Sequence, residues 1–528
     1  MADTMKVEGK EEGMAGQESR DIRYLIVRAG DGNLVDLFRF LSYGGKTHVF
    51  LGEDDGGPIP AGHRWVIFVS ILVRRLIAFF GKPMKWNGML LEFLLNLLSQ
   101  NGGLFGLLRN LFTGNVVVPQ RGSESFISAI GHLDLRLDLW KFDSSTLGVD
   151  EISKLAIDSP STGSRVLMDL CMMASKLAYE NTHVIRNIIN HRWKMHFVDF
   201  YNCWNDFQKA RSTQAFILCD KPEDANVVLI SFRGTEPFDP HDWITDVDYS
   251  WYEIPQMGKV HMGFLEALGL GNRNNLSTFQ FALQEGLKSQ SSFLTHSVHT
   301  SDSSGSYTGQ KDEIMEMDEM IACYAIRNKL KSLLSEHKKA KFVVTGHSLG
   351  GALAILFPAI LLFYEENELM ERLLAVYTFG QPRVGDEQFE RFMEGHVCHP
   401  VSKYFRVVYC NDLVPRVPYD NGIFLYKHFG HCIYYNSFYV EQNVNEEPNR
   451  NYFELRYLLP EYLNAAWELL RSLTMSYTYG PEYKETLFSI SLRVLGLAVP
   501  GISEHCPSNY VNSIRLGRSS TRMVPTSK

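Results

Sequence analysis

The chain has 528 residues and lacks several features that mark common functional classes. Its eight cysteines are scattered without C-x-x-C spacing, so no zinc site or thioredoxin-like motif is indicated. It has no basic excess, because the net charge is −8, whereas a nucleic-acid-binding domain presents a basic face. It also shows no internal repeat. We therefore expect a globular protein with no metal site and no nucleic-acid partner.

Long uninterrupted apolar runs are also missing. A spanning helix needs about 20 mostly apolar residues. The stretch Trp65–Phe80 is interrupted by Arg74 and Arg75, and Met89–Phe112 is interrupted by Glu92 and by a polar Gln-Asn-Gly-Gly sequence. The charges would be costly within a bilayer. Neither stretch therefore predicts a clean membrane span.

The first 20 residues are polar and charged and contain no apolar segment of the kind found in signal peptides. Residues 1–20 are therefore predicted to be a disordered tail. Without a secretory signal, the cysteines are expected to be free thiols on the cytosolic side of a membrane.

Two interpretations of the apolar region at 21–150 stay open. Its helices are either the buried core of a small N-terminal domain, or they lie in a lipid interface as a lipid-associating region. In the second case the large apolar side chains insert and the basic ones meet the headgroups. The inserting residues are then Trp65, Phe79, Phe80, Trp86 and Phe105, and the basic ones are Arg74, Arg75, Lys82, Lys85 and Arg109.

From residue 160 to 520, strand-like runs alternate with helical patterns, which predicts an α/β fold with a mostly parallel central sheet. A Ser-rich segment at 288–312 is predicted to be a disordered insertion. The predicted strands are Gln214–Cys219, Asn226–Phe232, Phe342–Val344, Ala375–Phe379, Tyr404–Cys410 and Cys432–Val440. The predicted helices are Arg165–Asn190, Glu313–His337, Asp386–Glu394, Tyr452–Tyr477 and Tyr483–Leu497.

One stretch, Lys341–Tyr364, carries the strongest chemical signal. An apolar strand leads into Gly346-His347-Ser348-Leu349-Gly350, and an apolar helix follows. A G-x-S-x-G turn between strand and helix is typical of a nucleophilic serine. The glycines are needed because a Cβ atom would collide at so sharp a turn. Ser348 is therefore the candidate nucleophile.

A serine hydroxyl needs a base, and the base needs a carboxylate to orient it. In the fold that this turn indicates, the chain order is serine, acid, histidine. Asp412 directly follows the strand Tyr404–Cys410 and is favoured over Asp386, which stands at a predicted helix start. Three histidines lie beyond Asp412, and spacing alone does not choose among them: His428, His431 and His505.

The oxyanion that forms during ester cleavage needs two hydrogen-bond donors. One is expected from the backbone N–H of Leu349, directly after the nucleophile. The other is expected from a loop after an earlier strand, where Thr235 follows Asn226–Phe232.

Several motifs, in order, resemble the class 3, fungal-type triacylglycerol lipase family. They are SFRGT (231–235), VHMGF (260–264), VVTGHSLGGALA (343–354), YTFGQPRVGD (377–386) and YCNDLVPRVP (409–418). The N-terminal apolar region and the segment PGISEHCPSNYVNSIRLG (500–517) resemble more narrowly the plant oil-body lipases. The resemblance implies an α/β-hydrolase fold over about 160–515.

The resemblance also implies roles for individual residues. It makes Ser348 the nucleophile, Asp412 the acid and His505 the base, with Thr235 and Leu349 at the oxyanion hole. It makes the loop at 236–248, with Phe238 and Trp243, the lid over the cleft, although its prolines Pro237 and Pro240 are unusual for the short lid helix of the family.

The expected function is hydrolysis of triacylglycerol and other acylglycerols without a cofactor, at the cytosolic surface of a lipid droplet (oil body) or another membrane. The N-terminal region would hold the protein at that surface. Three alternatives share the same motifs: a phospholipase A1 or galactolipase, a diacylglycerol lipase, and a lipase-like signalling scaffold that does not hydrolyse lipid.

Overall fold

The computed structural model describes residues 23–43, 47–53, 61–139, 165–295, 321–418, 426–450, 452 and 454–519. The predicted tail at 1–20 lies outside these ranges, as does 296–312 of the predicted insertion. Residues 288–295 continue helix α11 (Ser277–Thr295), so the start of that insertion is helical and not disordered as predicted.

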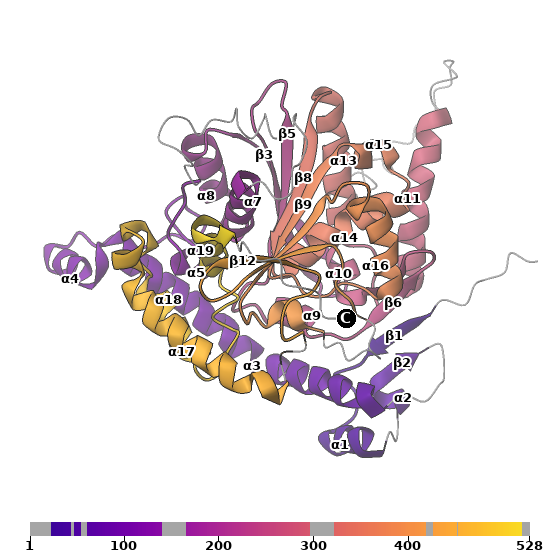
Figure 1. The fold of residues 1–528 in the computed structure, drawn as a ribbon, viewed down its shortest axis with the longest axis horizontal. Coiled ribbons are helices and arrows are strands. Elements are labelled where there is room, and N and C mark those ends of the chain that lie inside the picture. Colours follow the sequence, from indigo (N-terminus) through magenta and orange to yellow (C-terminus); the bar gives the residue numbers. More distant parts are fainter. Residues whose placement is uncertain are drawn as a thin grey trace, which may run out of the picture.

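A nine-stranded sheet forms the centre of the described chain (Figure 1), in the order β13-β12-β11-β10-β9-β8-β5-β4-β3. Each neighbouring pair from β5 through β8, β9 and β10 to β11 is parallel. The predicted, mostly parallel sheet is confirmed. The strands are β3 (His196–Asn205), β4 (Ala210–Cys219), β5 (Val227–Phe232), β8 (Lys341–His347), β9 (Leu373–Phe379), β10 (Tyr404–Tyr409), β11 (His431–Tyr435), β12 (Val440–Val444) and β13 (Arg518–Ser519).

Helices cover both faces of this sheet, which is why nearly every residue of its central strands is buried. In β5, Val228 and Ile230 pack into the core that contains α10 (Met262–Ala267), α13 (Ala322–Glu336) and α14 (Leu349–Phe363). The alternate residues Val227 and Leu229 pack into a second core with α7 (Arg165–Leu177) and α19 (Pro507–Leu516). Side chains alternate between faces along a strand, so both sets are buried.

Two predicted elements are divided in the structure. The helix expected over Arg165–Asn190 ends at Leu177, and α8 (Thr182–Asn187) begins after Asn181, whose side chain accepts hydrogen bonds from two backbone N–H groups of α8. A π-helical turn, η1 (Ile188–Arg192), follows. The strand expected over Cys432–Val440 is instead the antiparallel pair β11 and β12. Short polar turns at Glu180-Asn181 and Asn436-Ser437 separate the parts.

The N-terminal region is part of the same packed body as the later chain. Strand β1 (Tyr24–Val27) pairs with β6 (Trp251–Ile254) in a small antiparallel sheet of order β2-β1-β6-β7. The other two strands are β2 (Leu51–Glu53) and β7 (Gly258–His261). Strands far apart in the sequence therefore share one sheet.

The two interrupted apolar stretches form α3 (Ala61–Gln100), a single helix of 40 residues, and α4 (Gly103–Thr113). The start of α3 buries Val66, Ile67 and Ile71 beside α1 (Leu34–Tyr43), whereas α4 buries none of its side chains. The buried-core interpretation therefore holds for the start of α3, and the lipid-interface interpretation stays a prediction for the exposed part of the region. Within the described residues, no helix has both the length and the hydropathy required to cross a membrane.

Arg74 was expected at lipid headgroups, and that expectation is wrong. It is buried, and its guanidinium lies 2.8 Å from Asp248. The remaining helices are α2 (Thr47–Phe50), α5 (Ala129–Leu133), α9 (Pro240–Asp246), α15 (Asn367–Glu371), α16 (Glu387–Met393), η2 (Glu394–Cys398), η3 (Val414–Arg416), α17 (Leu455–Thr478), η4 (Pro481–Tyr483) and α18 (Leu487–Gly496).

Candidate active site

Ser348 stands at the tip of the turn between β8 and α14, with a strained backbone (φ 60°, ψ −133°). A Cβ on Gly346 would lie 2.1 Å from the backbone of Gly350, and one on Gly350 would lie 2.3 Å from the carbonyl oxygen of Phe232. Only glycine fits at both positions, as the sequence predicts. The side chain of Ser348 makes no capping hydrogen bond to α14, so its hydroxyl is not committed to the helix.

His505 and Asp412 are joined although they lie far apart in the sequence. Nδ1 of His505 lies 2.8 Å from Oδ2 and 3.0 Å from Oδ1 of Asp412, which is fully buried just beyond β10. A proton on Nδ1 that is donated to this carboxylate leaves the lone pair of Nε2 for proton transfer. Nε2 of His505 has no hydrogen-bond partner among the described residues, so no such bond links it to Ser348 in this conformation.

Contacts around Gly380 bring the pair next to the serine. The backbone N–H of Ser348 donates to the carbonyl of Phe379 at 2.9 Å. A Cβ on the next residue, Gly380, would lie 2.8 Å from Oδ2 of Asp412 and 2.9 Å from Cε1 of His505. The three predicted catalytic residues therefore meet at the end of β9.

Two residues that sequence reasoning missed hold this arrangement. The hydroxyl of Tyr510 in α19 donates to Oδ2 of Asp412. His347 contacts the backbone carbonyl of His505 through Nε2 at 2.9 Å, and its Nδ1 lies 2.9 Å from the hydroxyl of Tyr179. Burial lowers the pKa of His347 well below its usual value. His347 stands inside the G-x-S-x-G pattern, but no sequence signal singles out Tyr510.

The competing candidates have structural roles. Asp386 caps α16, accepting hydrogen bonds from the N–H groups of Gln388 and Phe389. His428 contacts the carbonyl of Pro415 at 2.6 Å, and burial lowers its pKa well below the usual value. His431 contacts the side chain of Asn443. Of the acid and base candidates, the structure joins only Asp412 and His505 into a pair.

The two predicted oxyanion-hole residues stand at the start of α14 and just beyond the end of β5. Leu349 begins α14, where backbone N–H groups carry partial positive charge. Thr235 follows β5, and its hydroxyl donates to Oδ2 of Asp246 at 2.5 Å. Asp246 closes the short helix α9, and burial raises its pKa to about 8. The side chain of Thr235 is thus held by the predicted lid segment.

The predicted lid segment, residues 236–248, contains helix α9. Pro240 occupies the first turn of α9, where a missing N–H costs nothing, and Asp239 caps the helix. The prolines, unusual for the family's lid helix, are therefore compatible with a short helix here. Trp243 donates its indole N–H to the carbonyl of Pro237 at 3.0 Å. Ser348 and Thr235 are only 5 % and 7 % exposed, so the site is closed.

Comparison with known proteins identifies the family. The family model described as Lipase (class 3) matches residues 229–422. Triacylglycerol lipase OBL1 of Nicotiana tabacum is 59% identical over 95% of this chain and 96% of its own length. The proteins of that name from Arabidopsis thaliana and Ricinus communis are 51% and 45% identical, each over 94% of this chain and 95% of their own length. The chain belongs to the class 3 lipase family. The resemblance drawn from the motifs is confirmed, as are the predicted α/β-hydrolase fold and the assignment as a hydrolase.

In this class 3 lipase, helix α3 runs along the lid segment. Ser70 donates to the carbonyl of Val247 at 2.6 Å, and Lys85 lies 3.8 Å from Asp239. The same helix presents two glycines to the lid segment: a Cβ on Gly81 would lie 3.1 Å from Pro240, and one on Gly88 would lie 2.2 Å from Phe238. The close approach of α3 to the lid segment therefore depends on small residues.

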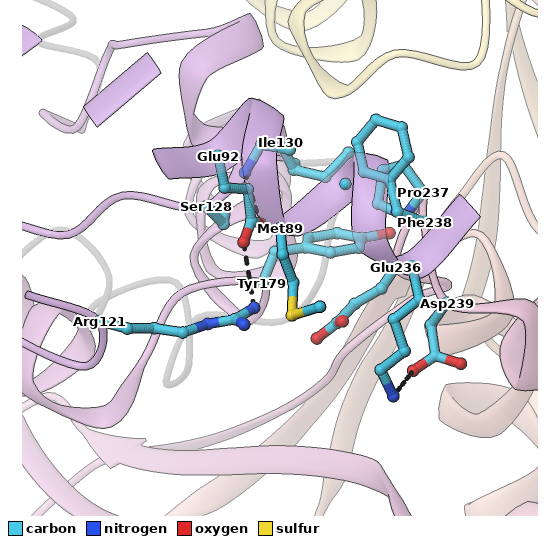
Figure 2. Close-up of a pocket in the computed structure, with 13 residues that line it drawn as sticks. Met89, Glu92, Arg121, Ser128, Ile130, Tyr179, Glu236, Pro237, Phe238 and Asp239 are labelled. Atoms are coloured by element: carbon cyan, nitrogen blue, oxygen red, sulfur yellow. Dashed lines mark hydrogen bonds and ion pairs between the residues drawn. The ribbon is translucent and has the colours of Figure 1, made fainter. Parts of the chain in front are cut away.

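A pocket of about 510 Å³, including its open mouth, lies between α3 and the start of the lid segment (Figure 2). Met89 and Glu92 of α3 line one side, and Glu236 and Phe238 line the other. Tyr179 also lines the pocket and is the residue bonded to His347, so the pocket adjoins the site without reaching Ser348. The ion pair of Glu92 with Arg121, at 3.1 Å, stands at this pocket.

Proposed function

We propose that this lipase hydrolyses the ester bonds of triacylglycerol at the surface of lipid droplets, using Ser348, His505 and Asp412, and releases free fatty acids. The observation that carries the proposal is the bond from Nδ1 of His505 to the buried carboxylate of Asp412 at 2.8 Å, beside a serine on a strained elbow. The identity to relatives named triacylglycerol lipase supports the choice of substrate.

The chemistry follows from the atoms in place. The hydroxyl oxygen of Ser348 attacks the ester carbonyl while Nε2 of His505 takes its proton. Asp412 keeps the imidazole in the required tautomer and stabilises its charged form. His505 then protonates the leaving alkoxide of the glycerol, and an acyl group remains on Ser348. Water, activated by His505, releases the fatty acid and restores the serine.

The developing oxyanion would be bound by the backbone N–H groups of Thr235 and Leu349. The hydrogen bond from the Thr235 hydroxyl to Asp246 fixes the loop that carries one of these donors. Removing one donor of this kind typically costs about 3 kcal/mol of transition-state stabilisation. The arrangement needs no metal and no organic cofactor.

Access to Ser348 requires the closed site to open, because the serine is only 5 % exposed, and the lid segment would be the part that moves. Phe238 and Trp243 lie on this segment, and Arg233 holds it closed through contacts with Glu236 and Asp242. A lid that opens at a lipid surface would expose the cleft where substrate is present.

The N-terminal region, residues 21–150, is proposed to contact the droplet. Phe105 and Phe112 of α4 are almost fully exposed, and Phe79 and Trp86 of α3 are largely exposed. Large apolar side chains on one helical surface are typical of proteins that bind a lipid interface. This contact would place the enzyme on the cytosolic face of the droplet.

The test compares wild type with Ser348→Ala on triolein emulsion, diolein and phosphatidylcholine vesicles. Ser231→Ala is a matched control, because its hydroxyl is buried in β5 and has no hydrogen-bond partner among the described residues. We expect Ser348→Ala to lose about 10⁴-fold or more in triolein hydrolysis, and Ser231→Ala to keep its activity.

Three outcomes would contradict the proposal. Equal rates for wild type and Ser348→Ala would favour a non-hydrolysing scaffold. Faster cleavage of phosphatidylcholine than of triolein would favour a phospholipase A1 or galactolipase. A clear preference for diolein over triolein would favour a diacylglycerol lipase.

A further inference from the structure

Helix α17 has its polarity inverted relative to an ordinary surface helix. Its buried side chains include the charged residues Glu461, Glu468 and Arg471. Its exposed side chains are large and apolar, spaced so that they follow one surface of the helix over its full length. They include Leu455, Leu459, Leu463, Trp467, Leu470 and Tyr477, which are between 41% and 90% exposed.

The buried charges explain how this orientation is held. Glu468 accepts a hydrogen bond from the hydroxyl of Tyr409 in β10 at 2.6 Å and lies 3.1 Å from Arg493 of α18. Arg471 donates to the hydroxyl of Tyr409 at 2.8 Å and pairs with Glu468 at 2.5 Å. Buried charges with such partners fix one orientation, because turning the helix over would leave them unpaired. The apolar face of α17 is therefore held outward.

Helix α18 repeats the inversion independently. Its one charged residue, Arg493, is buried and lies 2.6 Å from Glu485, whereas Leu487, Val494 and Leu495 are exposed. The chain then continues through the exposed Ile502 to His505. The exposed apolar side chains of α17 and α18 are here named the apolar flank. The last residue of the flank, Leu495, thus lies ten residues before the proposed catalytic base.

We propose that the apolar flank is a docking surface for the lipid monolayer of a droplet, in addition to the N-terminal helices. Soluble surfaces normally carry many charges. In the fully described helix α17, the only exposed charged residue is Arg456 in the first turn. A face without charge fits a neutral apolar phase better than it fits anionic headgroups.

Continuity with the N-terminal helices favours a lipid surface over a second copy of the chain. Helix α5 packs against both α3 and α18, and α18 packs against α17. Figure 1 shows α17 and α18 on the same flank of the molecule as α3 and α4. Exposed apolar side chains spread over four helices suit an extended lipid surface that also supplies the substrate. The inference rests on the proposed function for the identity of that lipid.

The test uses the full chain and artificial droplets of triolein coated with phosphatidylcholine. The variant is Leu459→Ser/Leu463→Ser/Leu470→Ser, and the matched control is Phe281→Ser, which removes a side chain that is 62% exposed on α11 outside the flank. We expect the triple variant to bind droplets about a hundredfold more weakly, from the loss of three partly inserted leucines. Binding of the wild type should be insensitive to salt, because no ion pairs are involved.

Two readouts, droplet flotation and hydrolysis, distinguish lipid docking from dimerisation and from the proposed function. The ratio of triolein hydrolysis to hydrolysis of a soluble short-chain ester should fall with droplet binding in the triple variant and stay unchanged in Phe281→Ser. Unaltered flotation of the triple variant, at an unaltered melting temperature, would overturn the proposal. The proposal would also be overturned if the wild type formed a dimer in lipid-free solution and the triple variant were monomeric but still floated with droplets. Wild-type flotation without triolein hydrolysis would instead refute the proposed function and leave the docking surface standing.

Discussion

The contact between Gly88 of α3 and Phe238 of the lid segment leaves no room for a methyl group. A Cβ added to Gly88 would lie 2.2 Å from Cβ and 2.5 Å from Cγ of Phe238. Cβ atoms essentially never approach other heavy atoms so closely, and neither atom of Phe238 is at the flexible end of the side chain. In Gly88→Ala the lid segment must therefore leave its closed position.

The size of the effect follows from two opposing contributions. Alanine in place of glycine within a helix stabilises that helix by about 1 kcal/mol. This gain is the same whether the lid is closed or open, so it cancels between the two states. Overpacking typically costs about 1–3 kcal/mol and applies only to the closed state. The closed-to-open ratio should therefore fall by roughly 5- to 150-fold.

Hydrolysis of p-nitrophenyl butyrate, kept below its solubility limit, reports the open fraction without a lipid surface. We expect Gly88→Ala to hydrolyse this ester several-fold faster than wild type. Gly395→Ala is the control, since a Cβ there meets nothing within 4 Å. In a double-mutant cycle, Phe238→Gly should abolish the effect of Gly88→Ala. Equal rates for Gly88→Ala and wild type, with no coupling in the cycle, would refute the idea that α3 holds the lid closed.

Two other expectations concern the closed site. Tyr510→Phe removes a hydrogen bond to the Asp412 carboxylate and should lower kcat about 5- to 20-fold with little change in KM on a soluble ester. An unchanged kcat would mean that Asp412 is positioned without it. Burial raises the pKa of Asp246 to about 8, so its folded form binds a proton more tightly than its unfolded form. Its contribution to stability is complete below about pH 4 and is lost toward pH 8, at about 1.4 kcal/mol per pH unit. Asp246→Asn should flatten this loss in urea titrations across pH 5–8, and parallel curves would contradict the assignment.

The parts of the site that the sequence predicts are those set by local geometry. The turn that carries Ser348 can be predicted, because Gly346 and Gly350 are required by contacts within a few residues of Ser348 or with one adjacent strand. Asp412 can be predicted because it follows a strand directly. His505 cannot be predicted from local pattern, since three histidines satisfy the chain order, and only the family resemblance favours one of them. The contact from Tyr510 to Asp412 spans 98 residues and depends on how α19 packs, which no local pattern records.

The apolar helices show a different limit of sequence reasoning. The leucine pattern of α17 is typical of a helix whose apolar side faces the core. In the structure Glu468 and Arg471 face inward, because Tyr409 and Arg493 supply partners that lie elsewhere in the chain. Arg74 shows the same effect, since its partner Asp248 lies 174 residues away. Periodicity shows that a helix has two faces, but the location of charged partners decides which face is buried.

Helix α3 connects the proposed lipid contact with the lid segment. Gly81, Lys85 and Gly88 face the lid segment, whereas Phe79 and Trp86, on the same stretch of helix, are exposed. An apolar surface that binds Phe79 and Trp86 therefore acts on α3, and the opposite side of α3 contacts Phe238. A displacement of α3 toward lipid would separate Gly88 from Phe238 and so release the lid. Gly88→Ala forces the same two residues apart without lipid. Activity of Gly88→Ala in solution and activity of wild type on droplets would then depend on one contact.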